Sequence, residues 1–161
     1  MITERPRRLA GVSYVGLQRY SVTVCTGFRK PIFEDFTVGN DVASQILQAA
    51  GDSQFDLVAY CLMPDHVHLL ASAQAEASDL TLLMKHAKQI TGFNYRQSTG
   101  RSLWQPGYYD RILRDDEATL TVAKYILENP VRAGLAKALG EWPLGGSSVY
   151  TWSELFALWE Q

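Results

Sequence analysis

Two histidines stand one residue apart in an otherwise apolar stretch of the chain, residues 61–70, which reads CLMPDHVHLL. His66 and His68 follow a Pro-Asp pair there, and only one other histidine occurs among the 161 residues. Because successive side chains of a β-strand point to opposite faces, the two imidazoles would share one face of a strand. Neutral imidazoles bind Zn, Mn or Fe, and together with oxygen ligands and water they can also serve Mg. The pair therefore indicates an open metal site, or else two half-buried histidines bonded to neighbouring groups.

A tyrosine and an asparagine four residues apart lie much later in the chain. Tyr125 and Asn129 occur in the segment KYILENP, and on a helix this spacing puts both side chains on one face. A tyrosine phenolate can attack phosphorus and hold the product covalently, but an ordinary pKa near 10 makes it a poor nucleophile without help. A metal held by the two histidines and by the carbonyl oxygen of Asn129 could polarise a phosphate for that attack. The alternatives are a core aromatic for Tyr125 and, for Asn129, an N-cap ahead of Pro130.

Hydrophobic periodicity and turn residues predict the strands that must position the histidines. Strands are predicted at residues 20–26, 55–63, 66–72 and 108–114, and a tight Met-Pro-Asp turn joins the second and third into a hairpin. In the third strand Val67, Leu69 and Ala71 would face helices on the side opposite the histidines.

Four helices are predicted from capping residues and helical periodicity. The first begins at a cap formed by Asn40 and Asp41 and ends at about residue 51, and the second is capped by Ser78 and Asp79, covers residues 80–97 and stops at Gly100. The third runs from the acids 115–117 to about residue 128, and the fourth from residue 129 to near Gly140. The order β-α-β-β-α-β-α with a tail predicts an α+β fold of the ferredoxin-like, or split βαβ, type. In that fold an antiparallel sheet carries its helices mainly on one face, and Tyr125 would stand on a C-terminal helix.

Length and composition predict one domain spanning residues 1–161, because a chain of this size with 47% hydrophobic residues can form a core. Residues 1–19 would form a basic N-terminal arm, and residues 141–161 a C-terminal tail that packs on the domain. No run of eighteen apolar residues or signal-peptide core is present, so we expect no membrane association and a cytoplasmic location. Cys25 and Cys61 are expected to be buried free thiols.

The net charge of −2 does not by itself indicate a nucleic-acid-binding protein, but the charges are unevenly distributed. Basic residues gather in residues 1–30 and 80–114, whereas acidic residues gather at 34–56, at 115–117 and in the C-terminal tail. Such clusters could form one face that binds polyanions, with a mixed solvated surface as the alternative.

Three segments, MPDHVHLL, LWQPGYYDRILRDDEA and YILENPVRAGL, resemble in their order and spacing the REP-associated tyrosine transposases. These belong to the single-tyrosine HUH transposases of the insertion-sequence 200/605 type, in which U is a hydrophobic residue, here Val67. The resemblance covers residues 20–148. It implies a ferredoxin-like fold in which His66 and His68 bind a divalent metal, Mg or Mn, Asn129 completes the metal site and Tyr125 is the nucleophile.

The same resemblance implies a metal-dependent single-stranded DNA endonuclease and strand transferase that forms a 5′-phosphotyrosine and releases a 3′-hydroxyl. The family's substrates are hairpin-forming repetitive extragenic palindromes (REP), so the protein would be associated with the nucleoid. Insertion-sequence relatives act as dimers and REP-associated members as monomers, which leaves both states open. A non-catalytic domain that holds single-stranded nucleic acid on the same sheet face is the alternative function.

Basic and aromatic side chains are our candidates for holding that DNA. They are Arg5, Arg7, Arg8, Arg19, Lys85, Lys88, Trp104, Tyr108, Arg111, Arg114 and Lys124. Packing in the core is the alternative for the two aromatic residues. The chain also departs from many relatives, which carry a histidine where Arg111 follows Tyr109-Asp110, so any role of that histidine is absent here.

Overall fold

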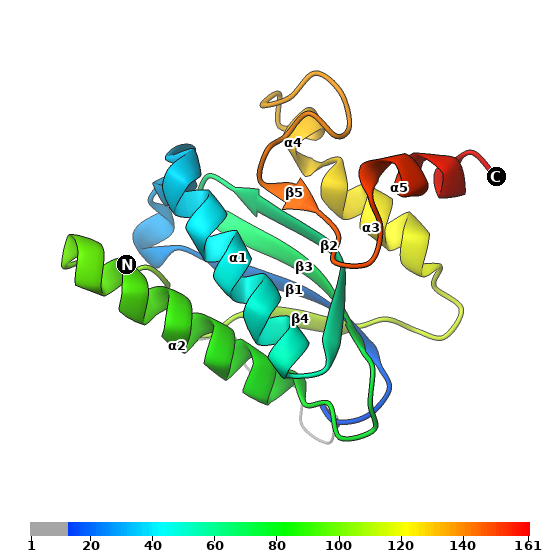
Figure 1. The fold of residues 1–161 in the computed structure, drawn as a ribbon, viewed down its shortest axis with the longest axis horizontal. Coiled ribbons are helices and arrows are strands. Elements are labelled where there is room, and N and C mark those ends of the chain that lie inside the picture. Colours follow the sequence, from blue (N-terminus) through cyan, green and yellow to red (C-terminus); the bar gives the residue numbers. More distant parts are fainter. Residues whose placement is uncertain (1–12) are drawn as a thin grey trace.

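The computed structural model describes residues 13–161, whose five β-strands form one antiparallel sheet in the order β4-β1-β3-β2-β5 (Figure 1). The strands are β1 (Arg19–Cys25), β2 (Phe55–Met63), β3 (His66–Ala73), β4 (Tyr109–Ile112) and β5 (Gly145–Gly146). Strand β3 lies between β1 and β2, which are joined through helix α1 (Phe36–Asp52), so these elements form a split βαβ unit. The fold class predicted from the sequence is confirmed.

The β2–β3 hairpin places both histidines at the start of a central strand. Its turn is Pro64-Asp65, as the sequence predicts, and β3 begins directly after it at His66. The residues opposite His66 and His68 are Met63 and Cys61 on β2, and Cys25 and Thr23 on β1. Because β3 has a partner on each side, its register is held by two ladders of hydrogen bonds.

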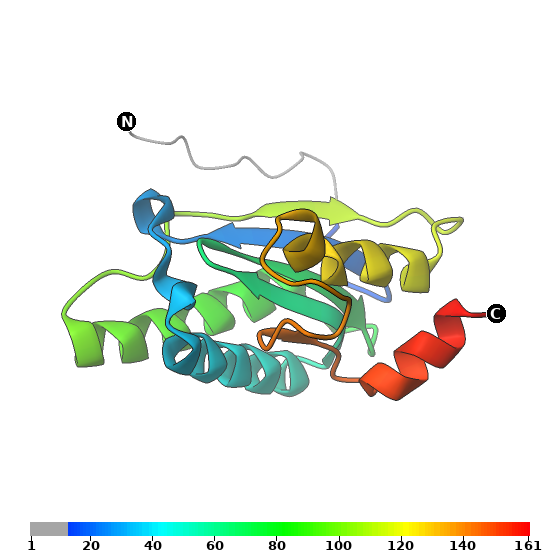
Figure 2. The same cartoon turned by 90° about the horizontal axis from the view of Figure 1, so that it is seen from above.

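Helices α1 and α2 (Leu80–Thr99) lie side by side on one face of the sheet (Figures 1 and 2). Val67, Leu69 and Ala71 belong to the buried cluster that these helices form with the sheet, as the alternation of β3 predicts. Burial of this apolar face removes hydrocarbon from water and accounts for most of the core.

The opposite face, which carries the histidines, is covered by the shorter C-terminal helices α3 (Thr119–Leu127) and α5 (Trp152–Trp159). Leu70 of β3 packs there against Ile126 and Leu127 of α3 and Leu155 of α5. The sequence predicted helices mainly on one face. The two longest helices share one face, while α3 and α5 pack on the other.

Three helix boundaries differ from the sequence-based expectation. Helix α1 begins at Phe36 rather than after Asn40, because the Asp35 carboxylate accepts hydrogen bonds from the first free amides. Helix α3 begins at Thr119, after the acids 115–117, whose Glu117 carboxylate instead accepts from the Arg111 side chain and the Arg114 backbone.

The third difference is the short helix α4 (Asn129–Arg132), which ends well before Gly140. Gly134 takes a left-handed φ of 74° just after it. Helix α2, in contrast, is capped by Asp79 and stopped by Gly100 at a φ of 72°, as predicted.

The C-terminal segment is tied to the rest of the fold by indole hydrogen bonds. Trp142 donates from Nε1 to the carbonyl of Leu62 at 2.9 Å, and Trp159 donates to the carbonyl of Leu120 at 3.0 Å. Cys25 and Cys61 are buried free thiols, as expected. Among residues 13–161, no helix has the length and apolar character needed to cross a membrane.

The packing of α1 on the C-terminal segment predicts a stability difference between two glycines of that helix. At Gly39 a Cβ would lie 2.5 Å from Cδ1 of the buried Leu144, whereas at Gly51 it would meet nothing within 4 Å. We expect Gly39→Ala to lower the free energy of unfolding by about 1–3 kcal/mol through overpacking. Gly51→Ala should raise it by up to about 1 kcal/mol, because alanine loses less chain entropy in a helix. Urea denaturation of both variants measures this, and equal stabilities would contradict it.

Candidate functional site

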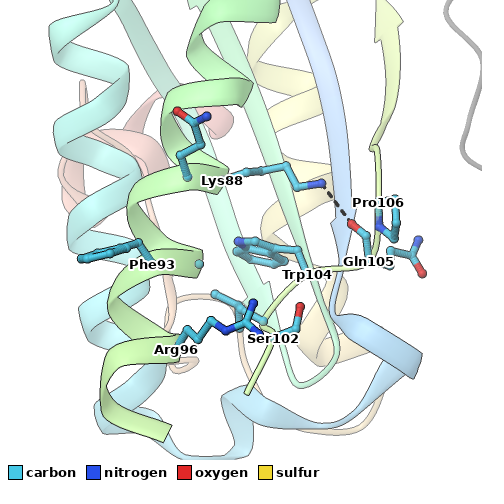
Figure 3. A pocket seen from close by; sticks show the side chains of 10 residues that line it. Lys88, Phe93, Arg96, Ser102, Trp104, Gln105 and Pro106 are labelled. Carbon is cyan, nitrogen blue, oxygen red and sulfur yellow. Dashed lines mark hydrogen bonds between the residues drawn. The ribbon is translucent and has the colours of Figure 1, made fainter. Parts of the chain in front are cut away.

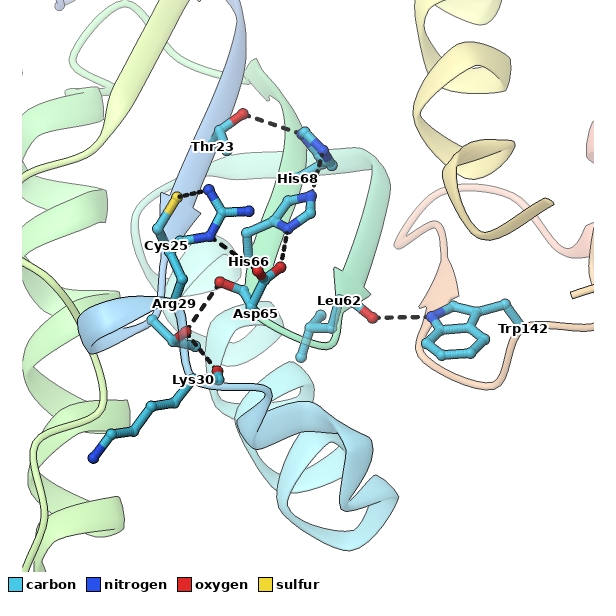
Figure 4. Close-up of polar contacts among 10 residues, drawn as sticks. Thr23, Cys25, Arg29, Lys30, Leu62, Asp65, His66, His68 and Trp142 are labelled. Atoms are coloured by element: carbon cyan, nitrogen blue, oxygen red, sulfur yellow. Dashed lines mark hydrogen bonds and ion pairs between the residues drawn. The ribbon is translucent and has the colours of Figure 1, made fainter. Parts of the chain in front are cut away.

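His66 and His68 point their Nε2 atoms at each other from the start of β3 (Figure 4). The two nitrogens lie 3.1 Å apart, and the rings are perpendicular with their centroids 4.8 Å apart. Each ring also has a partner for its other nitrogen. Nδ1 of His66 lies 2.6 Å from Oδ1 of Asp65, and Nδ1 of His68 lies 3.1 Å from Oγ1 of Thr23.

Asp65 determines which nitrogen of His66 carries the proton. Burial by itself would raise the pKa of the Asp65 carboxyl, but hydrogen bonds from Arg29 and His66 outweigh this and hold the pKa below its usual value. The carboxylate is therefore ionised and can only accept, so Nδ1–H of His66 donates to it, and in the neutral ring this leaves the lone pair on Nε2. Arg29 holds the carboxylate in place from the other side, with Nε 3.0 Å from Oδ2.

His68 is neutral in this environment. Burial first, and then the electrostatic effects of His66, Arg132 and Arg29, lowers the pKa of its imidazole to about 4. Its Nε2–H can donate to His66 while Nδ1 accepts from the Thr23 hydroxyl. Because a hydroxyl can also accept, the proton of His68 can move to Nδ1 and leave Nε2 free as well.

This arrangement fits a metal ion bound by two imidazoles. Two nitrogens that each lie about 2.1 Å from one ion, at right angles, are about 3.0 Å apart, close to the separation found between His66 and His68. Within the part of the chain that the structure describes, no three His, Cys, Asp or Glu side chains come together as a metal site. Cys61, opposite His68, is no candidate, because burial raises the pKa of its thiol to about 12. Oxygen donors would have to complete the coordination.

Tyr125 and Asn129 are brought together by Arg132. The Arg132 guanidinium lies over the Tyr125 ring at 3.9 Å, donates to the Tyr125 carbonyl at 2.6 Å and donates to Oδ1 of Asn129 at 2.8 Å. Glu128 pairs with the same guanidinium at 3.4 Å. The two residues do not share one helix as predicted, because α3 ends at Leu127 and Asn129 begins α4, but both contact Arg132. However, the oxygen expected to reach a metal is engaged by Arg132 instead.

The phenol of Tyr125 lies on the solvent-facing side of α3. Its side chain is 64% exposed, whereas Ala123, Ile126 and Leu127 of the same helix are buried against the sheet. Within residues 13–161, no hydrogen bond or ring contact joins Tyr125 to either histidine. Tyr125 is thus accessible to a substrate arriving from solvent, and its role as nucleophile stays a prediction.

Arg132 is the residue whose importance sequence reasoning underestimated. After burial and His66, its charge is the next cause of the lowered pKa of His68, and the same charge opposes the rise in the pKa of the Cys61 thiol. It therefore links the histidine face of the sheet to Tyr125 and Asn129. Its spacing of seven residues from Tyr125 and three from Asn129 was the available signal.

Several predicted DNA contacts are occupied within the protein. Arg19 donates to the carbonyls of Glu117 and Arg114 and to the Thr119 hydroxyl, and Lys88 donates to the carbonyls of Gln105 and Gly107. Arg111 and Arg114 lie by Glu117, and the Lys124 ammonium lies 5.9 Å from the Trp159 ring. Tyr108 packs in the core, which is the alternative that the sequence left open.

Other predicted contacts are accessible, since the side chains of Arg111 and Arg114 are 55% and 80% exposed despite their ion pairs. Lys85 is exposed on α2, and Trp104 is partly buried with its ring at the surface of a groove. Arg5, Arg7 and Arg8 of the expected basic arm lie outside the described residues.

Comparison with known families agrees with the motifs. The sequence model of the family described as Transposase IS200 like matches residues 14–129, which is more than half of the chain. The chain belongs to this family. The match includes the His66-Val67-His68 tripeptide, Tyr125 and Asn129.

The predicted resemblance to REP-associated tyrosine transposases is also confirmed. The chain is 27% identical over 118 residues to a Haemophilus influenzae protein assigned to this group, with 65% of each chain covered. It is 23% identical over 99 residues to the REP-associated tyrosine transposase of Escherichia coli, covering 61% of this chain and 58% of that protein. The chain therefore spans less than two thirds of the length of these relatives.

Solved structures share the fold. A REP-associated tyrosine transposase bound to a REP hairpin superposes with a TM-score of 0.68 at 20% identity, covering 89% of this chain and 82% of that one. A Deinococcus radiodurans protein assigned to the transposases gives a TM-score of 0.53 at 22% identity, covering 74% and 95%. At these identities the likeness establishes the fold of this family member and nothing finer.

The hydrogen bond from His66 to Asp65 predicts a change of tautomer in an Asp65 variant. In metal-free protein, neutral His66 should carry its proton on Nδ1, because Asp65 accepts it. Asp65→Ala removes the acceptor and should shift His66 to the Nε2–H form, whereas Asp65→Asn keeps a carbonyl oxygen and should retain the Nδ1–H form. ¹⁵N NMR of the imidazoles distinguishes the two. An unchanged tautomer in Asp65→Ala would show that Asp65 does not control this ring.

Proposed function

We propose that this chain is a metal-dependent single-stranded DNA endonuclease and strand transferase that acts at or near palindromic hairpins. The observation that supports it most is the pair of imidazoles with Nε2 atoms 3.1 Å apart, one oriented by a carboxylate, in a member of the IS200-like transposase family. The hairpin substrate is inferred from the structural neighbour, a relative solved in complex with a REP hairpin.

In the proposed reaction the Tyr125 oxygen attacks the scissile phosphorus of a DNA strand. The phenol loses its proton to solvent as a bond forms between its oxygen and phosphorus, the bond from phosphorus to the 3′-oxygen breaks, and the released 3′-oxygen takes up a proton from solvent. The strand is left with a 5′-phosphotyrosine, in which the phosphodiester bond energy is kept. Attack of a 3′-hydroxyl on this linkage reverses the step and joins strands without another energy source.

His66 and His68 would hold the divalent cofactor, Mg or Mn, through their Nε2 atoms. When bound, the ion would supply positive charge that polarises the scissile phosphate. Asn129 would add an amide oxygen once Arg132 releases it. That exchange is chemically reasonable, because a DNA phosphate offers the guanidinium a charged acceptor in place of a neutral amide.

Arg132 would position the nucleophile. Its guanidinium covers one side of the Tyr125 ring and donates to the Tyr125 carbonyl and to the Asn129 side chain, which limits the directions in which the phenol can point. The phenol itself is exposed, so a phosphate arriving from solvent can reach it without displacing core residues.

The remaining parts of the proposal concern the partners and the setting. The chain would act as one domain on single-stranded or hairpin DNA, as a monomer or homodimer, in the cytoplasm and in association with the nucleoid. A non-catalytic domain that binds single-stranded nucleic acid is the second candidate function. One observation favours this second candidate, namely that Oδ1 of Asn129 accepts a hydrogen bond from Arg132 and is not free to bind a metal.

The nucleophile assignment predicts a covalent protein–DNA adduct. Incubation with a labelled REP hairpin oligonucleotide and Mn²⁺ should give an adduct that resists denaturing electrophoresis, and Tyr125→Phe should give none, because its ring lacks the attacking oxygen. Tyr150→Phe is the matched control and should form the adduct as the unchanged protein does. If Tyr125→Phe cleaves the DNA as well as the unchanged protein, the mechanism is wrong and the binding-only function gains support.

The metal assignment predicts binding of Mn²⁺ that depends on the oriented histidines. Isothermal titration should show one Mn²⁺ site in the unchanged protein, and His66→Ala should abolish it. Asp65→Ala should weaken it about 10- to 100-fold, because the carboxylate orients the ligand. EDTA should stop adduct formation, and Mn²⁺ or Mg²⁺ should restore it. Equal Mn²⁺ affinity in His66→Ala would place the metal elsewhere.

A further inference from the structure

A groove with a volume of about 420 Å³ lies between α2 and the segment 102–106 (Figure 3). The buried clusters place α2 on the face of the sheet opposite the histidines, so this groove is separate from the candidate metal site. Its size is within the usual range for small-ligand sites.

The side chains around the groove combine aromatic rings with positive charge. Phe93 is 61% exposed, Arg96 is exposed and the Trp104 indole lines the wall between them and Lys88. None of the ten residues that line the groove is acidic. Aromatic surfaces on which bases stack, beside cations that meet phosphates, are the chemistry by which proteins hold unpaired nucleic acid.

The wall of the groove is rigidly built. Trp104 donates from Nε1 to the Thr91 hydroxyl at 2.8 Å, and its ring packs on Phe33 at a centroid distance of 5.8 Å. Lys88 donates to the carbonyls of Gln105 and Gly107, which fixes the segment that carries the indole. An aromatic ring held in place in this way loses little entropy when a base stacks on it.

A glycine of α2 borders the groove. Gly92 lines it, and a Cβ there would make an ordinary contact with Cδ1 of Trp104 at 3.8 Å. A larger side chain at this position would therefore extend into the space beside the indole.

Hydrogen bonds connect the groove to the same end of the sheet as the histidines. Trp104 forms an isolated β-bridge with Thr26, and the Gln105 amide donates to the carbonyl of Cys25, the residue opposite His66. The Thr26 amide in turn donates to the Asp65 carbonyl at 3.0 Å, and the Thr26 hydroxyl lies 3.0 Å from the same oxygen. The groove wall and the turn that orients His66 are thus fixed to one strand end.

An exposed turn of the chain follows directly from that strand end. Phe28 is 88% exposed, the highest value for a large hydrophobic side chain among residues 13–161. Phe28 and Arg29 have φ angles of 56° and 54°, a conformation that is costly for residues other than glycine. The Gly27 amide donates to the Leu103 carbonyl next to the groove, and Arg29 reaches back to Asp65. The turn that carries the Phe28 ring is therefore bonded both to the groove wall, at Leu103, and to Asp65, which orients His66.

We propose that the groove binds bases of an unpaired DNA segment, and that this segment reaches the groove from the histidine pair across the Phe28 turn. The identity of the ligand as DNA rests on the proposed function, whereas the stacking site rests on the groove itself. The groove would hold the flanking nucleotides at a constant distance from the phosphate that is cut.

Filling the groove tests this proposal without removing any hydrogen bond. The probe is single-stranded oligodeoxythymidine of about ten nucleotides, and its binding to Tyr125→Phe protein, which cannot cleave, is followed by fluorescence anisotropy. We expect Gly92→Leu in this background to weaken binding about tenfold, as loss of stacking on one base would. Gly51→Leu is the matched control, because it makes the same change at an open position on helix α1.

A second variant tests the path to the groove. Phe28→Ala should weaken binding of the same oligonucleotide several-fold and leave thermal stability unchanged, because the ring is 88% exposed. Unchanged oligonucleotide affinity in Gly92→Leu would overturn the groove assignment. A groove that binds a peptide instead of DNA would give this same result. The proposed function is judged separately, since it fails if protein with Tyr125 intact forms no covalent adduct, whatever Gly92→Leu does.

Discussion

The register of β3 between its two neighbours is the constraint on which the rest of the site depends. A shift of one residue would turn both imidazoles to the opposite face and bury them against α1 and α2. In the observed register Thr23 stands beside His68 on β1, and the hairpin turn leaves Asp65 beside His66. Two backbone ladders and two side-chain hydrogen bonds therefore fix two nitrogen atoms 3.1 Å apart. An open strand at the edge of a sheet could not hold them so closely.

Electrostatics keep the two rings suited to metal binding. The burial and neighbouring positive charges that lower the pKa of His68 make its neutral form the stable one, so the ring offers a lone pair rather than a second proton. At His66 the Asp65 carboxylate accepts a hydrogen bond from Nδ1–H, so in the neutral ring Nε2 carries the lone pair. Arg29 neutralises that carboxylate, which allows a charged group to lie beside two half-buried rings.

One face of the sheet forms most of the core, and the other carries the candidate metal site. One face is filled by α1 and α2 and supplies most of the apolar core, while its helix α2 also forms one side of the aromatic groove. The other face leaves room for the histidines at one end and is closed by α3 and α5 over the rest. Arg132, the last residue of α4, contacts both parts of the candidate site. Its charge acts on His68, and its guanidinium covers the Tyr125 ring. The candidate site thus lies at the end of this sheet face that α3 and α5 leave uncovered.

Local pattern alone determined the order of the first four strands and four α-helices, the hairpin at Pro64-Asp65 and the shared face of His66 and His68. It also determined the capping of α2 by Asp79, because strand alternation and helix caps depend on near neighbours. It did not predict β5 or α5 in the C-terminal tail. The sequence also pointed to Tyr125 and Asn129 as one helical pair. Only the tertiary structure decided what those side chains contact. Arg29 meets Asp65 across 36 residues and Trp104 meets Thr26 across a still longer separation, contacts that no local periodicity encodes. Whether Asn129 faces a metal or Arg132 depends on competition between two partners, and the fold, rather than the spacing, determines which one lies within reach.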